Sequence, residues 1–405
     1  MDFGNIGSYF ELVLSKRLSA VDVDQRISHQ HELGGFAALR PLLGDDDIQR
    51  IPSLYIYLDD EGVCTDRSWT TWYDTRRKQA TRGPEYRLYY PDVEPVKRAC
   101  AGDLTITCLT KDGELAFFFV ASGSYREAEM LWLFGIDGEE GSFTPARDME
   151  RRIDATGAEL LDVLGFEVEP PDELHGYLED MLRLWPDAFP SGRAFSRFAR
   201  DVSGIDPRSN PDEALVEYYN TQTMLFMGYE RYEHERRLGP YVRNVGDPDY
   251  EAILKVAMSM FQRRRSAAGH ALEYHLEALF DARDISYTAQ SLTEGRERPD
   301  FIFPSISAYR DAGFPEAGLT LLGAKTTAKD RWRQILQEGR RVKRKHLITL
   351  EPAITIEQTD EMEERNLQLV VPAPIQSSYS RAQRGWLWSV EDFCNHVANT
   401  QAWSE

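Results

Sequence analysis

The pattern of apolar residues changes near residue 166, and this change constrains the fold more than any other feature of the sequence. Before it, short runs rich in β-branched and aromatic residues are separated by turn residues, which is typical of strands. These runs are residues 53–58, 85–90, 104–110 and 113–122. Several short strands of this kind favour a barrel-like or sandwich architecture. The sequence therefore predicts a mainly-β domain over residues 1–165.

Residues 166–185 carry Pro170 and Pro171 among acidic residues, which indicates an exposed linker. Beyond it, segments with helical spacing alternate with short apolar runs. Helices are expected from residue 213, over 271–282, and from Asp330 to Val342, where Gly339 weakens the helix without breaking it. Strands are expected at 300–306, 319–325, 346–350 and 367–372. This alternation predicts an α/β domain over residues 186–405.

The composition excludes some classes of protein. The chain has 47 basic and 67 acidic residues, a net charge of −20, which argues against a non-specific coat for nucleic acid or anionic membranes. No run approaches the roughly 18 apolar residues of a membrane span, and the first residues lack the pattern of a secretory signal. The four cysteines form no CxxC pair, so we expect reduced thiols, no structural zinc and a cytoplasmic location.

The second domain contains two acidic residues and a lysine that could together cleave a phosphodiester. Asp300 follows Pro299 at the start of an expected strand, Lys325 comes 25 residues later, and Glu338 another 13 residues later. Cleavage of a phosphodiester requires a divalent metal on hard carboxylate oxygens, with positions left open for water and phosphate. An ammonium group nearby can orient the attacking water and stabilise charge on phosphorus. If the two expected strands pair, Asp300 and Lys325 converge, and Glu338 can reach the same edge.

Glu273 is a fourth candidate, because it lies on the expected helix at 271–282. It is four residues from Glu277, a like-charge pair that mildly destabilises a helix unless a cation is near. The alternative is that both are solvated helix glutamates, and this is the favoured interpretation for Glu277.

Residues 325–345 hold nine basic and two acidic residues. A solvated amphipathic helix is one interpretation of this run, and a surface that binds a phosphate backbone is the other. Within it, Lys329, Asp330 and Arg331 alternate in charge. Arginine or lysine can donate to guanine and aspartate can accept from cytosine, so this triplet suits a G·C-rich edge of the major groove.

Four runs of the second domain resemble a known family. The runs EYHLEALF, TEGRERPDFIFPS, KTTAKDRWRQIL and LQLVVP are similar to the catalytic half of the EcoRII-type (type IIE) restriction endonucleases, within the PD-(D/E)xK superfamily. The resemblance covers most of residues 186–375. It implies an α/β restriction-endonuclease-like domain, with a mixed sheet flanked by helices, that cleaves double-stranded DNA.

The resemblance also implies the roles of individual residues. The catalytic set would be Glu273, Asp300, Lys325 and Glu338, with Asp300 and Glu338 as ligands of Mg²⁺. Base recognition would fall on the triplet at 329–331. Two residues before the lysine, where the superfamily commonly has an acid, this chain has Gly323, and Glu338 would take over that function.

EcoRII-type enzymes also carry an N-terminal effector domain, a pseudobarrel similar to the DNA-binding fold of certain plant transcription factors. It binds a second copy of the target. Here SKRLSAVD with the following His29-Gln30, and DTRRKQATRG, resemble its two DNA-gripping arms. The implied effector-binding residues are Arg17, His29, Arg76, Lys78 and Arg82.

The resemblance further implies a homodimer that recognises a short, near-palindromic site with C·C/G·G flanks, similar to CCWGG. Its implied functional counterpart is a cognate cytosine DNA methyltransferase in a prokaryotic cytoplasm. One departure concerns the first helical segment, which is arginine-rich in the family but contains Tyr218 and Tyr219 here. These rings would either stack on an extruded base or pack within the helical layer.

Two other functions remain open on sequence grounds. One is a sequence-specific DNA-binding protein with a silent nuclease half. The other is a structure-specific repair nuclease of the same superfamily.

Overall fold

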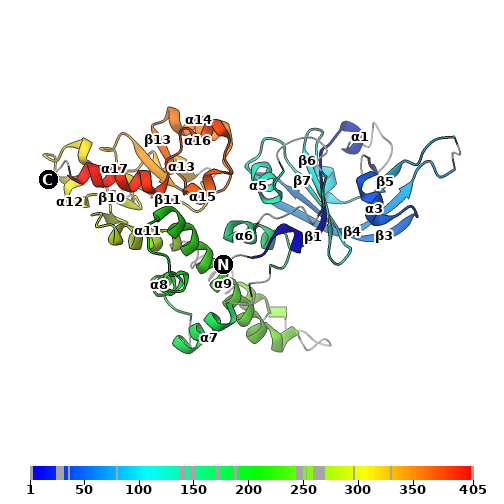
Figure 1. Cartoon of the computed structure of the whole chain (residues 1–405), viewed down its shortest axis with the longest axis horizontal. Coiled ribbons are helices and arrows are strands. Elements are labelled where there is room, and N and C mark those ends of the chain that lie inside the picture. Colours follow the sequence, from blue (N-terminus) through cyan, green and yellow to red (C-terminus); the bar gives the residue numbers. More distant parts are fainter. Residues whose placement is uncertain are drawn as a thin grey trace. The chain divides into compact units, whose positions relative to one another are not determined.

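The computed structural model describes most of the chain in two compact units. The described residues are 3–23, 32–34, 37–78, 81–136, 143–145, 152–168, 171, 174–186, 189–242, 250–251, 253–258, 270–294, 297–328 and 331–402. The N-terminal unit contains Gly4–Ile153 and Glu159–Glu167, and the C-terminal unit contains Asp154–Ala158 and Val168–Glu405 together with Met1–Phe3. Figure 1 colours the first unit mainly blue to cyan and the second mainly green to red.

The N-terminal unit is built on one eight-stranded sheet. Its strands are β1 (Phe10–Arg17), β2 (Glu32–Leu33), β3 (Ile48–Leu58), β4 (Val63–Asp74), β5 (Tyr86–Tyr89), β6 (Leu104–Thr110), β7 (Leu115–Val120) and β8 (Phe143–Pro145). Their order is β2-β5-β4-β3-β7-β6-β1-β8, and every pair is antiparallel except β3 with β7. The predicted mainly-β domain is thus confirmed. The predicted runs correspond to β3, β5, β6 and β7, whereas β1, β2, β4 and β8 were not predicted.

Short helices accompany this sheet, and aromatic residues fill its core. The helical segments are η1 (Ile6–Ser8), α1 (Ala20–Val23), η2 (Ala37–Leu39), α3 (Arg40–Leu43), α4 (Glu94–Arg98), α5 (Tyr125–Phe134) and α6 (Ala155–Val163), the last shared between the two units. The rings of Tyr55 and Phe117 stack 5.0 Å apart, and those of Trp72 and Tyr86 stack 4.8 Å apart. All four side chains are buried, which gives the unit a core of its own.

The C-terminal unit is a mixed five-stranded sheet between helices. The strands are β9 (Thr288–Ala289), β10 (Phe301–Phe303), β11 (Thr320–Ala324), β12 (Lys345–Ile348) and β13 (Leu367–Val370). Their order is β13-β12-β11-β10-β9, with β9, β10 and β11 antiparallel and β11, β12 and β13 parallel. The helical segments are α7 (Leu174–Leu184), α8 (Gly192–Ser203), α9 (Pro211–Val242), α11 (Ala271–Ala282), α12 (Ile306–Arg310), η4 (Glu316–Gly318), α13 (Trp332–Ile335), α14 (Ile356–Glu364), α15 (Ala373–Gln376), α16 (Arg381–Arg384) and α17 (Val390–Ala402).

Alternation along the short strands directs side chains to both faces of this sheet. On one face, Ile302 and Leu321 belong to a core cluster that also contains Trp332 of α13. On the other face, the Phe301 ring meets the Phe280 ring of α11 at 5.3 Å. Helices therefore cover both faces, as predicted. Every residue of β10 and of the central strand β11 is buried.

Two expected elements differ from the structure. The linker at 166–185 contains the helix α7, because Leu174 and Met181 provide a buried apolar face on that segment. The helix expected from Asp330 to Val342 ends at Ile335. Gly339 has a φ of +55°, and a Cβ there would lie 2.4 Å from Leu321 Cδ1, so the chain turns sharply against the sheet instead of continuing as a helix.

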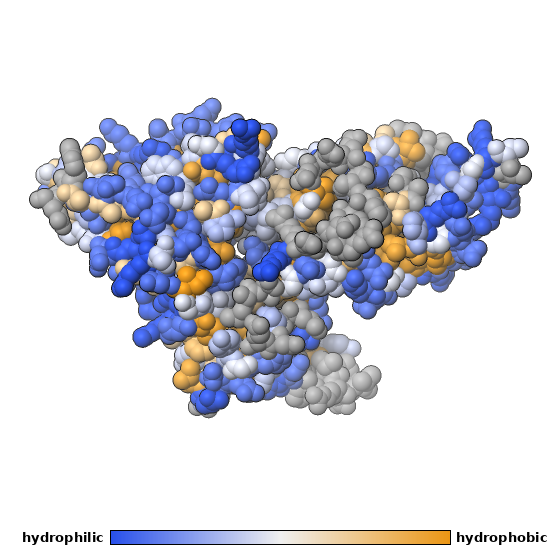
Figure 2. Space-filling model, in the orientation of Figure 1, coloured by the Kyte–Doolittle hydropathy of each residue, from blue (hydrophilic) through white to orange (hydrophobic). Residues whose placement is uncertain are grey.

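The four cysteines, Cys64, Cys100, Cys108 and Cys394, are free thiols. Among the described residues, no helix has the length and apolar character needed to cross a membrane. Figure 2 shows mainly hydrophilic residues on the face in view, with small apolar areas between them.

Asp212 connects the first long helix to the end of the chain. It is buried near the start of α9, and its carboxylate accepts hydrogen bonds from the backbone amides of Ala373 (2.8 Å), Val390 (2.8 Å) and Glu391 (3.0 Å). These amides lie at the first turns of α15 and α17, where a helix leaves its N–H groups without internal partners.

We expect Asp212→Ala to lower the free energy of unfolding of the C-terminal unit by about 3 kcal/mol, because it leaves three amides without this acceptor. Urea denaturation followed by tryptophan fluorescence measures the change. Asp360→Ala, which removes an exposed acid on α14, is the matched control and should change stability by less than about 0.5 kcal/mol. Equal stabilities of the two variants would contradict this role of Asp212.

Candidate active site

Asp300 lies immediately before β10, next to the start of the antiparallel pairing with β11. It is 6% exposed. Its Oδ2 accepts hydrogen bonds from the Ala324 amide and from Lys325 Nζ, both at 2.7 Å. The register that pairs Phe301 with Leu322 explains the contact, because it brings the residue before β10 beside the end of β11. The 25-residue separation in sequence therefore becomes a direct ion pair.

Glu273 reaches the same site from α11. The side-chain amide of Gln290 donates to Glu273 Oε2 at 3.0 Å and to Asp300 Oδ1 at 2.9 Å. Burial, reinforced by the negative charge of Asp300, raises the pKa of Glu273 above its usual value. Gln290 thus bridges two carboxylates that would otherwise repel each other.

The sequence analysis did not identify Gln290. It follows the two-residue strand β9, has a φ of +50°, and donates its backbone amide to the Asp300 carbonyl at 3.0 Å. A single glutamine after a short strand carries no sequence signal, since the pairing of β9 with β10 is what gives it a role.

Glu338 approaches from the turn that follows α13. Its amide donates to the Ile335 carbonyl at 3.1 Å, which holds it close to the end of that helix. Burial and then the charge of Asp300 raise the pKa of Glu338 to about 7, and Lys325 and Lys345 act in the opposite direction. The structure therefore joins Glu273, Asp300 and Lys325 through hydrogen bonds, and it places Glu338 close enough for the charges of Asp300 and Lys325 to act on its carboxyl.

Two further details explain why Glu338 lies here. The Lys345 ammonium is buried and donates to the Leu336 carbonyl at 2.6 Å, two residues before Glu338. At Gly323, a Cβ would lie 2.4 Å from Ile335 Cδ1. An acidic side chain two residues before Lys325 would therefore collide with α13, so a carboxylate must come from beyond that helix.

The donor set fits a hard divalent cation. Mg²⁺ commonly takes one or two carboxylates and completes its coordination with water and substrate phosphate oxygens. Asp300 and Glu338 are such carboxylates, and the fully buried strands behind them exclude water from one side. In the described part of the chain, no group of three or more acidic, histidine or cysteine side chains could hold a metal by itself. A cation here would thus depend on ligands from outside the protein.

Comparison with known proteins agrees with this geometry. Residues 226–394 match the family model described as EcoRII C terminal. This matched segment contains every residue of the expected catalytic set. The chain is 34% identical over 251 residues to the type II restriction enzyme EcoRII of Escherichia coli, a match that covers 62% of this chain and 60% of that enzyme. The chain therefore spans less than two thirds of the length of this curated relative.

Two solved structures are also similar. One is metal-depleted Ecl18kI in complex with uncleaved, modified DNA, with 20% identity, 57% of this chain and 86% of that chain covered, and a TM-score of 0.46. The other is the restriction endonuclease PspGI in a substrate DNA complex, with 15% identity, 53% and 93% covered, and a TM-score of 0.43. The predicted resemblance to EcoRII-type restriction endonucleases is confirmed by the family match.

Glu277 also lies in the matched segment, but its environment differs from that of the four candidate residues. The Glu277 carboxylate forms an ion pair with Arg193, whose guanidinium also lies 4.6 Å from the centre of the Tyr274 ring. Glu277 therefore links α8 to α11, and the expectation that it is a solvated helix glutamate was wrong, because its side chain is ion-paired and largely buried.

The predicted base-recognition triplet also lies in the segment that matches the EcoRII C-terminal model. Arg331 is exposed at the start of α13, between the buried residues Ala328 and Trp332. Lys329 and Asp330 lie outside the described residues. The loop that carries the triplet leaves β11 directly after Lys325, so recognition and catalysis would share one short segment.

The basic run at 325–345 is less available to DNA than its charge indicates. Arg341 donates to the carbonyls of Asp311 (2.9 Å) and Phe314 (2.8 Å), and Lys345 is buried. Others contact acidic or polar side chains: Arg333 with Glu361, Arg340 with Glu297, and Arg344 with Gln368. Most of this charge therefore stabilises the fold. Within the described part of the run, Arg331, Lys343 and Arg344 are exposed cations without an ion pair, and Arg344 instead donates to Gln368 and lies over the Trp388 ring.

The expected effector-binding residues lie in the N-terminal unit and differ in their freedom to meet a ligand. Arg17 is paired with Glu127, and Arg76 with Glu85. Lys78 and Arg82 are exposed on the connection between β4 and β5. His29 lies outside the described residues.

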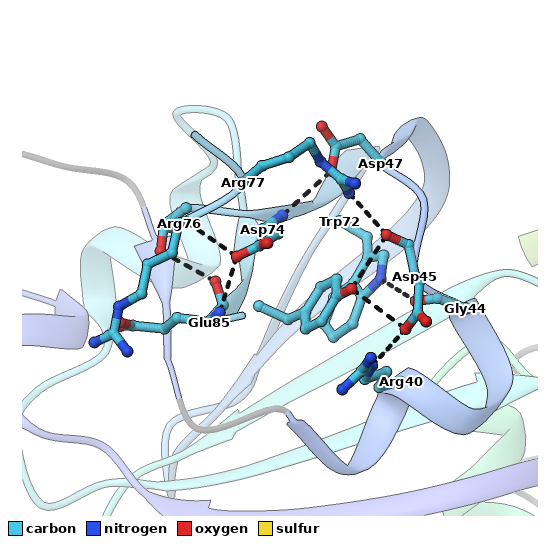
Figure 3. Close-up of polar contacts among 11 residues, drawn as sticks. Arg40, Gly44, Asp45, Asp47, Trp72, Asp74, Arg76, Arg77 and Glu85 are labelled. Atoms are coloured by element: carbon cyan, nitrogen blue, oxygen red, sulfur yellow. Dashed lines mark hydrogen bonds and ion pairs between the residues drawn. The ribbon is translucent and has the colours of Figure 1, made fainter. Parts of the chain in front are cut away.

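Figure 3 shows how the base of this connection is held. Asp74 Oδ1 accepts from the amides of Arg76 (2.9 Å) and Glu85 (2.8 Å), which closes the base of the loop. Arg77 pairs with Asp47 at 2.5 Å and donates to the Asp45 carbonyl at 2.7 Å. The loop is therefore fixed at its base, while Lys78 and Arg82 project beyond it.

Tyr218 and Tyr219 are part of the helical packing. They are 3% and 5% exposed. The Tyr218 hydroxyl donates to the Ile205 carbonyl at 2.7 Å, and its ring lies 5.6 Å from that of the buried His275. In this structure neither ring is available to stack on a base, so the packing interpretation fits both residues.

Proposed function

We propose that this protein is a divalent-metal-dependent type II restriction endonuclease of the EcoRII type. The observation that carries the proposal is the convergence of Asp300, Lys325, Glu338 and Glu273 at one edge of the mixed sheet. Four separate segments of chain contribute these residues, and a bound cation would relieve the mutual repulsion of the three carboxylates. The match of residues 226–394 to the EcoRII C-terminal model also supports a restriction endonuclease.

Each residue has a distinct part in the proposed reaction. Asp300 and Glu338 would hold Mg²⁺, which supplies positive charge against the charge that develops on the scissile phosphate. Lys325 donates to Asp300 at 2.7 Å, which places its ammonium where it can orient a water molecule or neutralise a phosphate oxygen. Gln290 and Glu273 keep the Asp300 carboxylate in a fixed orientation.

The proposed substrate is double-stranded DNA with a short, near-palindromic site and C·C/G·G flanks, similar to CCWGG. Lys329, Asp330 and Arg331 would read its G·C pairs in the major groove. A two-fold related target requires the same reading surface twice, so we propose a homodimer. The N-terminal unit would bind a second, effector copy of the site through Lys78, Arg82 and neighbouring cations.

The proposed biological setting is a restriction system in a prokaryotic cytoplasm. A cognate cytosine DNA methyltransferase would protect the host's own copies of the site. Methylation of plasmid at the cleaved sequence should therefore block cleavage.

Incubating plasmid with the full chain and Mg²⁺ tests the proposed function. Discrete fragments whose sequenced ends share one motif are the expected result, and they report the target and the stagger together. A gel shift without cleavage would instead support a DNA-binding protein with a silent nuclease half. Cleavage confined to forks or mismatches, without a common sequence, would support a repair nuclease.

A further inference from the structure

Glu351 is a buried acid just beyond β12 that the proposed mechanism does not use. It is 2% exposed. Its Oε2 accepts a hydrogen bond of 2.6 Å from the backbone amide of Ala328, which itself is fully buried. Burial of a carboxylate is costly unless hydrogen bonds compensate for the lost water, so this contact needs a structural reason.

This contact is one of several hydrogen bonds that join the end of β12 to the loop after β11. The Lys325 amide donates to the Ile348 carbonyl at 3.0 Å. The Thr349 hydroxyl donates to the Thr326 carbonyl at 3.2 Å, and it accepts from the Glu351 amide at 3.2 Å. The backbone of the loop is therefore held at residues 325, 326 and 328 in succession.

This held segment ends where the recognition triplet begins. Residue 328 is the last one before Lys329, and the Arg331 amide donates to the Ala328 carbonyl at 2.8 Å. The position of Arg331 thus depends on that of Ala328, which Glu351 fixes. Trp332, directly after the triplet, is fully buried.

We propose that Glu351 is a positioning residue for base recognition, through its buried hydrogen bond to the backbone immediately before Lys329-Asp330-Arg331. The proposal rests on the proposed function of that triplet. Bidentate reading of a base needs its donors within a fraction of an ångström of the base edge, because hydrogen bonds weaken steeply with misalignment. Release of Ala328 would let the triplet shift, and the protein would then distinguish its target less well from similar sequences.

The test measures sequence discrimination in the full chain, with Ca²⁺ in place of Mg²⁺ so that binding is read without cleavage. Fluorescence anisotropy gives the dissociation constants for the target duplex and for duplexes with one substituted G·C pair. We expect Glu351→Leu to reduce the ratio of these constants by about tenfold or more, since one base contact contributes about that much discrimination. Glu351→Gln keeps an oxygen that can accept from Ala328 and should retain most of the discrimination.

Gln383→Met is the matched control for general destabilisation. Gln383 is 6% exposed in the same unit, but it donates to the Ile354 carbonyl (2.8 Å) and to Thr359, away from the loop. The Gln383→Met variant should lower the free energy of unfolding without changing the ratio of the dissociation constants. If Glu351→Leu does not fold, Glu351→Asp decides the question, because it keeps the carboxylate but shortens the side chain so that its oxygen no longer reaches the Ala328 amide, and a reduced ratio is again expected.

The outcomes separate this proposal from the proposed function. A wild-type protein that prefers one sequence, together with a folded Glu351→Leu variant that prefers it equally, would overturn the role of Glu351 alone. An unchanged ratio in a folded Glu351→Asp variant, when the leucine variant does not fold, would do the same. A wild-type protein without any sequence preference would overturn both proposals.

Discussion

Replacing Lys325 by alanine is expected to slow DNA cleavage by about a thousandfold or more, while specific binding changes only a few-fold. The ammonium group forms an ion pair with Asp300 at 2.7 Å inside the convergent site. Loss of one preorganised charge at a reacting phosphate costs about 4 kcal/mol of transition-state stabilisation, which corresponds to that factor. Binding depends mainly on the base-reading loop and on phosphate contacts elsewhere, so it should be retained.

Single-turnover cleavage with Mg²⁺ and anisotropy with Ca²⁺ measure the two quantities separately. Lys343→Ala is the matched control, because it removes an exposed lysine from the same basic run without touching the site. Its cleavage rate should stay within a few-fold of that of the wild type. Unimpaired cleavage by Lys325→Ala would remove Lys325 from the mechanism.

Replacing Glu338 by glutamine is expected to slow cleavage by at least about a hundredfold and to raise the Mg²⁺ concentration needed for half-maximal rate about tenfold or more. One of the two proposed ligand carboxylates loses its charge, and hard cations bind anionic oxygen more strongly than amide oxygen. Glu364→Gln, on the exposed side of α14, serves as the control and should leave both quantities unchanged.

The raised pKa of Glu338 predicts that the Mg²⁺ requirement of cleavage depends on pH. Burial and Asp300 raise the pKa of Glu338 to about 7, so below that pH its carboxyl is mostly protonated, and it must release a proton before it can hold a cation. In the wild type, the Mg²⁺ concentration for half-maximal cleavage should therefore rise about fivefold from pH 7 to pH 6 and change little above pH 8. Glu338→Gln should lose this dependence. A wild-type requirement that is flat between pH 6 and 8 would contradict the assignment.

The sequence predicted the two architectures because the apolar patterns of their strands are strong. Residues 104–110 carry nearly uninterrupted strand formers and are β6, and residues 271–282 show a clear helical period and are α11. β4 was not identified, because most of its side chains are only half-buried and its stability comes from pairing with strands on both sides. Tertiary pairing of this kind leaves little trace in local composition.

In the candidate site, too, the features next to strong local patterns were predicted and those that depend on tertiary contacts were not. Asp300 and Lys325 were predicted to converge because each adjoins an apolar strand, and antiparallel pairing brings such positions together. The path of the chain to Glu338 was predicted incorrectly, since the close packing of Gly339 against Leu321 ends the helix early. Gln290 and Glu351 were not identified, because their roles depend on partners 10 and 23 residues away that only the fold reveals.

The central claim is that Asp300 and Glu338 bind one divalent ion beside Lys325. Anomalous diffraction from crystals of the full chain soaked in Mn²⁺ tests it most directly. We expect one manganese peak at roughly 2.1 Å from carboxylate oxygens of both residues, and its loss in crystals of Glu338→Gln. A manganese ion bound elsewhere, or a peak that persists in the glutamine variant, would contradict the claim.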